Sequence, residues 1–275
     1  MPLYQAIWLA IIQGLTEFLP ISSNAHLTVV PTLMGWKDPG LGFDVALHAG
    51  TLAAIVIYFF RDWVQVIANG LGFSYRGHRP DENSRGLLWF LVIATIPAGV
   101  AGLKFQKYAE NSWRNFYVIG AAEIILGLLL FIADRVGREK DGLNQMNLFD
   151  SIFIGLAQAL AIIPGVSRSG VTITAARFLH FDREAAARFS FLLSAPIIAA
   201  AASKDAWDLH KEGGIPLEMR LPYSVGILVS GVVGVLVIAF FLRYLRRHSL
   251  DVFVWYRIGF GIMVIALAVF FRIGG

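Results

Sequence analysis

Two short groups of polar residues interrupt an otherwise apolar chain, and the first follows an N-terminal apolar run. Gln13 and Glu17 lie four residues apart, which places both side chains on one face of a helix. Ser22, Ser23 and His26 follow directly. A carboxylate at the centre of a bilayer costs about 2.5–3.5 kcal/mol on insertion scales, so it usually serves a site or pathway. Glu17 could bind a divalent cation, and His26 could accept a proton.

The second group lies in residues 164–172, which read Pro-Gly-Val-Ser-Arg-Ser-Gly-Val-Thr and open an apolar helix. Backbone amides and hydroxyls at the start of a helix form a site for anions. An arginine adds a fixed charge whose fork geometry matches phosphate oxygens. The segment therefore predicts a phosphate-binding site. Its members are Ser167, Arg168, Ser169, Gly170 and Thr172.

Each group also has a purely structural interpretation. Gln13 and Glu17 could be a polar pair that packs two helices, and a serine after proline commonly caps a helix. The second group could be a capped turn whose Arg168 extends to the membrane interface.

Four further polar residues in apolar segments are ambiguous. Asp44 and His48 repeat the four-residue spacing and could support a metal site. Glu123 and Arg257 could belong to the site, or could form an ion pair that relieves the cost of burying each charge.

The composition requires lipid around most of the surface. The chain has 275 residues, of which 57% are hydrophobic and 15% charged, against about 45–50% and about 25% in soluble domains. We expect an all-α polytopic membrane protein that forms one domain over residues 1–275. The N-terminal run Leu3–Leu19 is interpreted as mature protein, because it lacks a basic leader and carries polar residues. The six expected spans are Phe43–Phe60, Leu87–Leu103, Tyr117–Ile132, Phe189–Ala202 with its flanks, Tyr223–Leu242 and Val252–Phe271.

Charge and cysteine content narrow the function further. The net charge of +4 suits anionic lipid headgroups and makes no case for nucleic acid. The absence of cysteine excludes disulfides and thiolate metal sites.

An internal duplication at a spacing of about 140–146 residues divides the chain into halves of about 1–140 and 141–275. For example, Tyr117-x-Ile119-Gly120 recurs as Tyr256-x-Ile258-Gly259. Each half predicts a pair of apolar helical segments interrupted at Pro20 or Pro164, followed by three spanning helices. Backbone that leaves the helix at membrane depth needs protein or water around it, so each broken pair predicts a re-entrant hairpin.

Three spans per half require the second half to be inverted relative to the first. The loops 61–86, 133–148, 176–188 and 243–251 hold 13 Lys and Arg residues, whereas the opposite face, which has both termini, holds 8. The positive-inside rule then places the termini outside, and the first hairpin enters from the outer face.

With these motifs, the whole chain resembles the bacterial undecaprenyl-pyrophosphate phosphatases of the bacitracin-resistance family. The resemblance implies hydrolysis of undecaprenyl diphosphate to undecaprenyl phosphate for peptidoglycan assembly, in the bacterial plasma membrane, with a site open to the periplasmic side. It also implies a divalent cation, Mg²⁺ or Ca²⁺. One departure is Gln13, which stands where many relatives have a second glutamate; another is Asn24-Ala25, in place of the more usual Thr-Gly.

Carried onto this chain, the family pattern assigns catalysis to Glu17, Ser23, His26 and Arg168. Ser22 joins the phosphate-binding residues of the second group, and the metal falls to Glu17 and Gln13, with Asp44 as a further candidate. Three nucleophiles stay open: His26, Ser23 activated by His26, and a metal-bound water.

Two other functions share parts of this pattern. A type-2 phosphatidic acid phosphatase needs a Pro-Ser-Gly-His element and a separate His and Asp after its arginine, whereas His180 and Asp182 lie too close together for that pattern. A polyprenyl-phosphate flippase would share the inverted repeat and broken helices. Oligomeric state is left open, a homodimer included.

Overall fold

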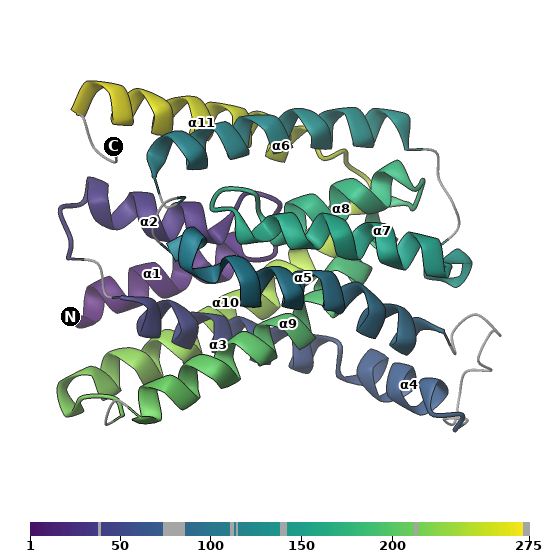
Figure 1. Cartoon of the computed structure of the whole chain (residues 1–275), viewed down its shortest axis with the longest axis horizontal. Helices are drawn as coiled ribbons and strands as arrows, with labels where there is room; N and C mark the ends of the chain where they lie inside the picture. Colours follow the sequence, from purple (N-terminus) through teal and green to yellow (C-terminus); the bar gives the residue numbers. More distant parts are fainter. Residues whose placement is uncertain are drawn as a thin grey trace.

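The computed structural model describes residues 1–37, 40–73, 86–110, 113, 115–137, 142–211 and 214–271, and its regular elements are helices (Figure 1). The α-helices are α1 Leu3–Thr16, α2 Ser23–Leu33, α3 Leu41–Tyr58, α4 Phe60–Gly70, α5 Leu87–Glu110, α6 Phe116–Val136, α7 Leu148–Ala159, α8 Arg168–Phe178, α9 Arg183–Lys211, α10 Leu217–Leu245 and α11 Asp251–Phe271. Two short 3₁₀ helices, η2 Leu143–Gln145 and η3 Leu160–Ile162, flank α7.

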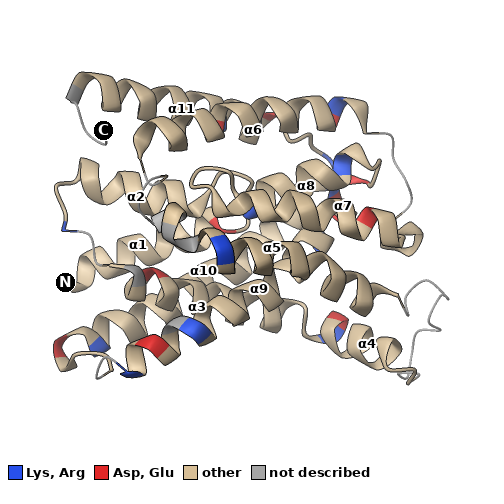
Figure 2. Ribbon diagram, in the orientation of Figure 1, with Lys and Arg blue, Asp and Glu red and all other residues tan. Residues whose placement is uncertain are grey.

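Five helices are long and apolar enough to cross a membrane, namely α5, α6, α9, α10 and α11. They coincide with five of the six expected spans, because an apolar run of about 20 residues is what a bilayer core requires. Large apolar side chains on their outer faces stay exposed, among them Leu103 at 83% and Leu236 at 64%. Figure 2 shows charged residues gathered toward the two ends of the helices, with few along the middle. The chain is therefore a multi-pass membrane protein.

The sixth expected span, Phe43–Phe60, is not one straight helix. Helix α3 ends at Tyr58, α4 begins at Phe60, and the two axes bend by 74°. The segment 61–86, which the sequence predicted as a loop, therefore begins inside helix α4. Arg61 and Asp62 explain the bend: these charges would be costly inside the bilayer, and Asp62 pairs with Arg188 of α9 at 2.5 Å. Counted together, α3 and α4 make up the sixth candidate span.

Two pairs of short helices enter from opposite ends of the molecule (Figure 1). Helices α1 and α2 lie at the end that also holds both termini, whereas α7 and α8 enter from the other end. With 14 and 11 residues, α1 and α2 are each too short to span a bilayer, as is α8 with 11. The chain leaves the helix between Thr16 and Ser23, and again between Ile162 and Arg168, where the proline-containing runs predicted it.

Part of the charge count behind the predicted orientation lies outside the described residues. These positions are Arg76, Arg79, Arg85, Arg114, Arg138, Lys140 and Arg272.

Small residues allow the close helix crossings that membrane interiors favour. At the crossing of α3 and α10, a Cβ on Gly50 would lie 2.1 Å from Ser230 Oγ and 2.3 Å from the Ile227 carbonyl oxygen. Ser230 Oγ donates to the Leu47 carbonyl at 3.0 Å and joins the same two helices.

Gly50→Ala is expected to destabilise the protein by about 1–3 kcal/mol, because the added methyl group forces α3 and α10 apart. The measurement is thermal unfolding of the purified protein in detergent. Gly102→Ala in α5 is the matched control, since its Cβ would meet nothing within 4 Å. Equal melting temperatures for the two variants would contradict the packing argument.

Candidate active site

Glu17 lies at the point where the two broken pairs meet. It follows the last residue of α1, is 7% exposed, and receives hydrogen bonds from Gln13 Nε2 at 3.0 Å and Ser23 Oγ at 2.5 Å. The Arg168 guanidinium forms an ion pair and hydrogen bond with its other carboxylate oxygen. His48 Nε2 of α3 lies 3.5 Å away. The two sequence groups, one from each half, thus converge on a single carboxylate.

The side chains that contact this carboxylate differ in their exposure. Gln13 is fully buried, whereas Ser23 and the side chains of Arg168 and His48 are partly exposed. Arg168 is the first residue of α8, and its Nη1 also donates to the Ser194 carbonyl of α9 at 3.5 Å. The partly exposed Ser23 hydroxyl and Arg168 guanidinium therefore contact the buried Glu17 carboxylate.

The two breaks, which are the segments that join α1 to α2 and α7 to α8, share an unusual backbone conformation. Ser22 and Ser167 both have φ of 65°, and each caps the helix that follows. Ser22 Oγ accepts from the Ala25 amide at 3.4 Å, and Ser167 Oγ from the Gly170 amide at 3.1 Å. A residue other than glycine in this region costs about 1–3 kcal/mol, so the surroundings must hold both turns in place.

Arg257 of α11 holds both breaks. Its Nη1 donates to the Pro20 carbonyl at 2.8 Å, and its Nη2 donates to the carbonyls of Gly165 at 2.9 Å and Val166 at 3.2 Å. Its charge is balanced by the Glu123 carboxylate, 3.1 Å from Nε, and both residues are almost completely buried. The pair is thus an ion pair, as one of the two interpretations predicted, and it also binds the backbone of the site.

A further hydrogen bond joins the same two segments. Ser169 Oγ of α8 donates to the Leu19 carbonyl at 3.0 Å. The first break is therefore held by α8 as well as by α11.

Both ring nitrogens of His26 bond to groups other than the Ser23 hydroxyl. Its Nδ1 donates to the Ser22 carbonyl at 2.7 Å, so in the neutral ring Nε2 accepts from the Tyr256 hydroxyl at 2.6 Å. The ring also stacks on Phe260, with centroids 4.3 Å apart. Tyr256 was not expected at the site, although it belongs to the Tyr-x-Ile-Gly repeat and could have been examined for that reason.

The other predicted phosphate-binding residues lie behind Arg168. Ser167, Ser169, Gly170 and Thr172 are buried, and their polar groups have protein partners. Thr172 Oγ1, for example, contacts Ser190 Oγ at 2.6 Å and donates to the Arg168 carbonyl at 2.8 Å.

The donor set around Glu17 fits a hard divalent cation in part. Within the described ranges, no group of three or more His, Asp and Glu residues is arranged to hold a metal ion. However, Gln13 Oε1 is buried and accepts no hydrogen bond there, beside the Glu17 carboxylate. Mg²⁺ typically takes one or two protein oxygens and fills its shell with water and substrate phosphates. The backbone carbonyl of Asp44 accepts a hydrogen bond from His48 Nδ1 at 2.7 Å.

These features define a class of protein: a multi-pass helical membrane protein in which two broken helix pairs bring a carboxylate, a serine and an arginine together. The chain belongs to the bacitracin resistance protein BacA family, whose model matches residues 6–263. This membership sets aside the type-2 phosphatidic acid phosphatase alternative.

Curated relatives match nearly the full length. The chain is 48% identical over 268 residues to the undecaprenyl-diphosphatase of Moorella thermoacetica, covering 97% of this chain and 98% of the relative. It is 45% identical to the undecaprenyl-diphosphatase of Pelotomaculum thermopropionicum, with 98% and 97% covered. A relative of the same name from Chlorobaculum tepidum is 43% identical, with 97% of each chain covered.

Arg257→Lys is expected to lower the melting temperature in detergent strongly. Lysine keeps the charge but cannot reach the carbonyls of both breaks, and each buried carbonyl left without a donor costs about 1–3 kcal/mol. Arg135→Lys is the matched control, because Arg135 pairs with Asp251 at an exposed position where such pairs contribute about 0–1 kcal/mol. Similar melting temperatures for the two variants would show that the Arg257 contacts are dispensable.

Proposed function

We propose that the chain hydrolyses undecaprenyl diphosphate to undecaprenyl phosphate and inorganic phosphate at the site around Glu17. The substrate follows from the names of relatives that match nearly the whole chain. The observation that carries the assignment of the site is the convergence of Ser23 and Arg168 on one carboxylate. In the cell this reaction recycles the lipid carrier of peptidoglycan synthesis and confers resistance to bacitracin.

Ser23 is the nucleophile in this proposal, and Glu17 is its base. Ser23 Oγ already donates its proton to Glu17 Oε2 at 2.5 Å, whereas both His26 nitrogens are engaged elsewhere. The serine oxygen attacks the terminal phosphorus, the phosphoanhydride P–O bond breaks, and undecaprenyl phosphate leaves. The water oxygen then attacks the phosphoserine phosphorus, the bond between Ser23 Oγ and phosphorus breaks, and Ser23 recovers the proton held by Glu17. Both protons of the water leave with the oxygen as part of the inorganic phosphate. In this scheme His26 positions the Ser22 carbonyl and therefore the loop that carries Ser23.

Arg168 binds the diphosphate and stabilises the charge on the transferred phosphoryl group. Its present partner is Glu17, so an incoming diphosphate competes with the carboxylate for the guanidinium. The exchange leaves Glu17 free to accept the serine proton. The amides of α8 and the buried hydroxyls of Ser22 and Ser167 shape the turns behind it.

The cation of the family, Mg²⁺ or Ca²⁺, would be held by oxygens of Glu17 and Gln13, with Asp44 as a further candidate. When bound it neutralises charge on the diphosphate. Gln13 Oε1 supports this placement, because it is a buried acceptor with no described donor.

We also propose that the two halves form an inverted repeat with re-entrant hairpins. Ser22 and Ser167 cap equivalent 11-residue helices with the same φ. Helix α1 packs on α10 of the other half, and its counterpart α7 packs on α5. Together with the loop charges, this arrangement supports a topology in which the termini lie on the outer side of the plasma membrane and the site opens toward that side.

Ser23→Ala and Arg168→Ala are each expected to reduce phosphate release from undecaprenyl diphosphate by about 10²–10³-fold or more, because one loses the nucleophile and the other the phosphate clamp. The assay uses the purified full-length protein in detergent, where hydrolysis needs no second compartment. Ser249→Ala is the control, since its hydroxyl contacts Asp251 away from the site.

Wild-type rates in Ser23→Ala would refute the serine nucleophile. Movement of lipid phosphate across liposomes with no release of phosphate would favour the flippase instead.

Gln13→Glu is expected to lower the Mg²⁺ concentration for half-maximal phosphate release by about tenfold, equivalent to ~1.4 kcal/mol. The physical reason is that a second carboxylate beside Glu17 attracts the cation more strongly than an amide does. A titration of phosphate release against Mg²⁺ for both proteins measures it. An unchanged midpoint would remove Gln13 from the metal site.

A further inference from the structure

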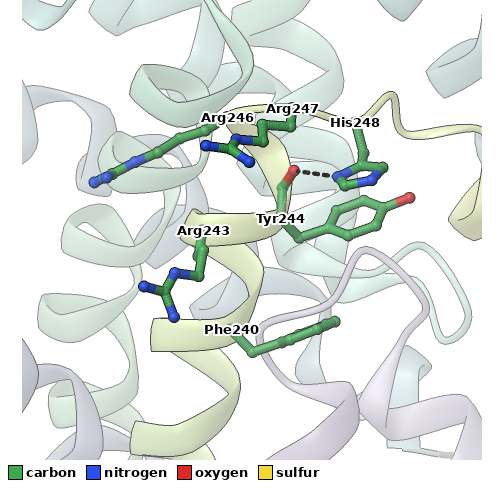
Figure 3. Close-up of a pocket in the computed structure, with 6 residues that line it drawn as sticks. All are labelled: Phe240, Arg243, Tyr244, Arg246, Arg247 and His248. Atoms are coloured by element: carbon green, nitrogen blue, oxygen red, sulfur yellow. Dashed lines mark hydrogen bonds between the residues drawn. The ribbon is translucent and has the colours of Figure 1, made fainter.

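The last turn of α10 borders a hollow of about 530 Å³ that is separate from the residues around Glu17. Figure 3 shows three arginines that fan out from this turn, with two aromatic rings and an imidazole beside them. The lining residues are Phe240, Arg243, Tyr244, Arg246, Arg247 and His248. None of these six residues is among the described partners of Glu17, which are Gln13, Ser23, His48 and Arg168, so the proposed hydrolysis does not use this hollow.

Two of these arginines lack a carboxylate partner. Arg246 is held by two hydrogen bonds to Glu184, at 2.9 and 3.1 Å. By contrast, no residue in the described part of the chain forms an ion pair or side-chain hydrogen bond with Arg243 or Arg247, and both are exposed. His248 is also exposed, and its Nδ1 donates to the Tyr244 carbonyl at 3.1 Å (Figure 3). Within the described residues, the hollow therefore presents two guanidinium groups that have no carboxylate partner.

Other arginines at the same end of the molecule do have partners. Arg135 pairs with Asp251 at 3.0 Å, Arg183 with Asp134 at 2.7 Å and Arg188 with Asp62 at 2.5 Å. Arg243 and Arg247 thus differ from these three arginines in having no carboxylate partner among the described residues.

An apolar strip leads along α10 into the hollow. Leu236 is 64% exposed and Phe240 is 58% exposed, and Arg243 and Arg247 follow at steps of three and four residues. Within α10 this spacing keeps Leu236, Phe240 and Arg243 on one face of the helix, and Arg247 follows two residues after the helix ends at Leu245. A long apolar group can lie along Leu236 and Phe240 while a phosphate at its end meets the two arginines.

We propose that this face of α10 binds an anionic membrane phospholipid, with its phosphate between Arg243 and Arg247 and an acyl chain along Leu236 and Phe240. Charge complementarity favours an anionic headgroup over a zwitterionic one. Continuity with the lipid-facing strip favours a phospholipid over free phosphate, which would gain nothing from Leu236 and Phe240. The site is independent of the proposed hydrolysis.

The test measures binding of fluorescent phosphatidylglycerol to the full-length protein in nanodiscs of phosphatidylcholine. The double variant Arg243→Gln/Arg247→Gln is expected to bind about tenfold more weakly or worse, because each arginine near a membrane surface contributes to attraction of anionic lipid. The control Arg135→Gln/Arg220→Gln removes the same charge from exposed positions outside the hollow and is expected to bind as wild type does.

Three results would overturn the proposal. They are equal binding by the double variant and wild type, an equal loss in the control, and displacement of the lipid by millimolar inorganic phosphate. If the double variant unfolds, each single substitution is measured, and an unchanged affinity in both would overturn it as well. Weaker binding in the variant alone, with undiminished phosphate release, supports a lipid site distinct from the active site.

Discussion

The arrangement of the site depends on how one buried arginine satisfies backbone that has left the helix in the interior of the protein. Buried peptide groups outside a helix need another hydrogen-bond partner. Arg257 donates to carbonyls in both breaks, at Pro20 on one side and at Gly165 and Val166 on the other. Since the same side chain contacts both segments, it helps to hold the segments that carry Glu17 and Arg168 next to each other.

Glu123 completes this arrangement by balancing the charge of Arg257. A buried ion pair does not by itself stabilise a fold, because removing both charges from water costs several kcal/mol per ion. The Arg257–Glu123 pair matters because of where it lies in the protein. The pair places a rigid, fivefold hydrogen-bond donor where two irregular turns meet, and these turns carry the strained Ser22 and Ser167.

Around Glu17 the same low-dielectric surroundings strengthen each polar contact. The carboxylate has neighbours on three other helices, Ser23, His48 and Arg168, so its orientation is determined before any substrate arrives. Catalysis of phosphoryl transfer rests largely on such preorganised positioning and charge. The lipid diphosphate of the proposed reaction would bind here, whereas the arginines at the end of α10 form a separate site.

The sequence alone determined the features that depend on local pattern. Long apolar runs located five spans because the bilayer thickness sets their length, and the proline-containing runs located both breaks because proline and the residues around it interrupt helical hydrogen bonding. The types and spacing of Glu17, Ser23 and Arg168 indicated phosphate chemistry.

Tertiary structure decided the contacts between distant segments. His26 meets Tyr256 across 230 positions of sequence, and the repeat that contains Tyr256 does not indicate this partner. Arg257 binds carbonyls that every residue possesses, so its contacts have no sequence signature. The bend at Phe59 likewise depends on a partner for Asp62 in α9. Local pattern defines which residues can react, whereas only the packing of helices from both halves defines which of them meet.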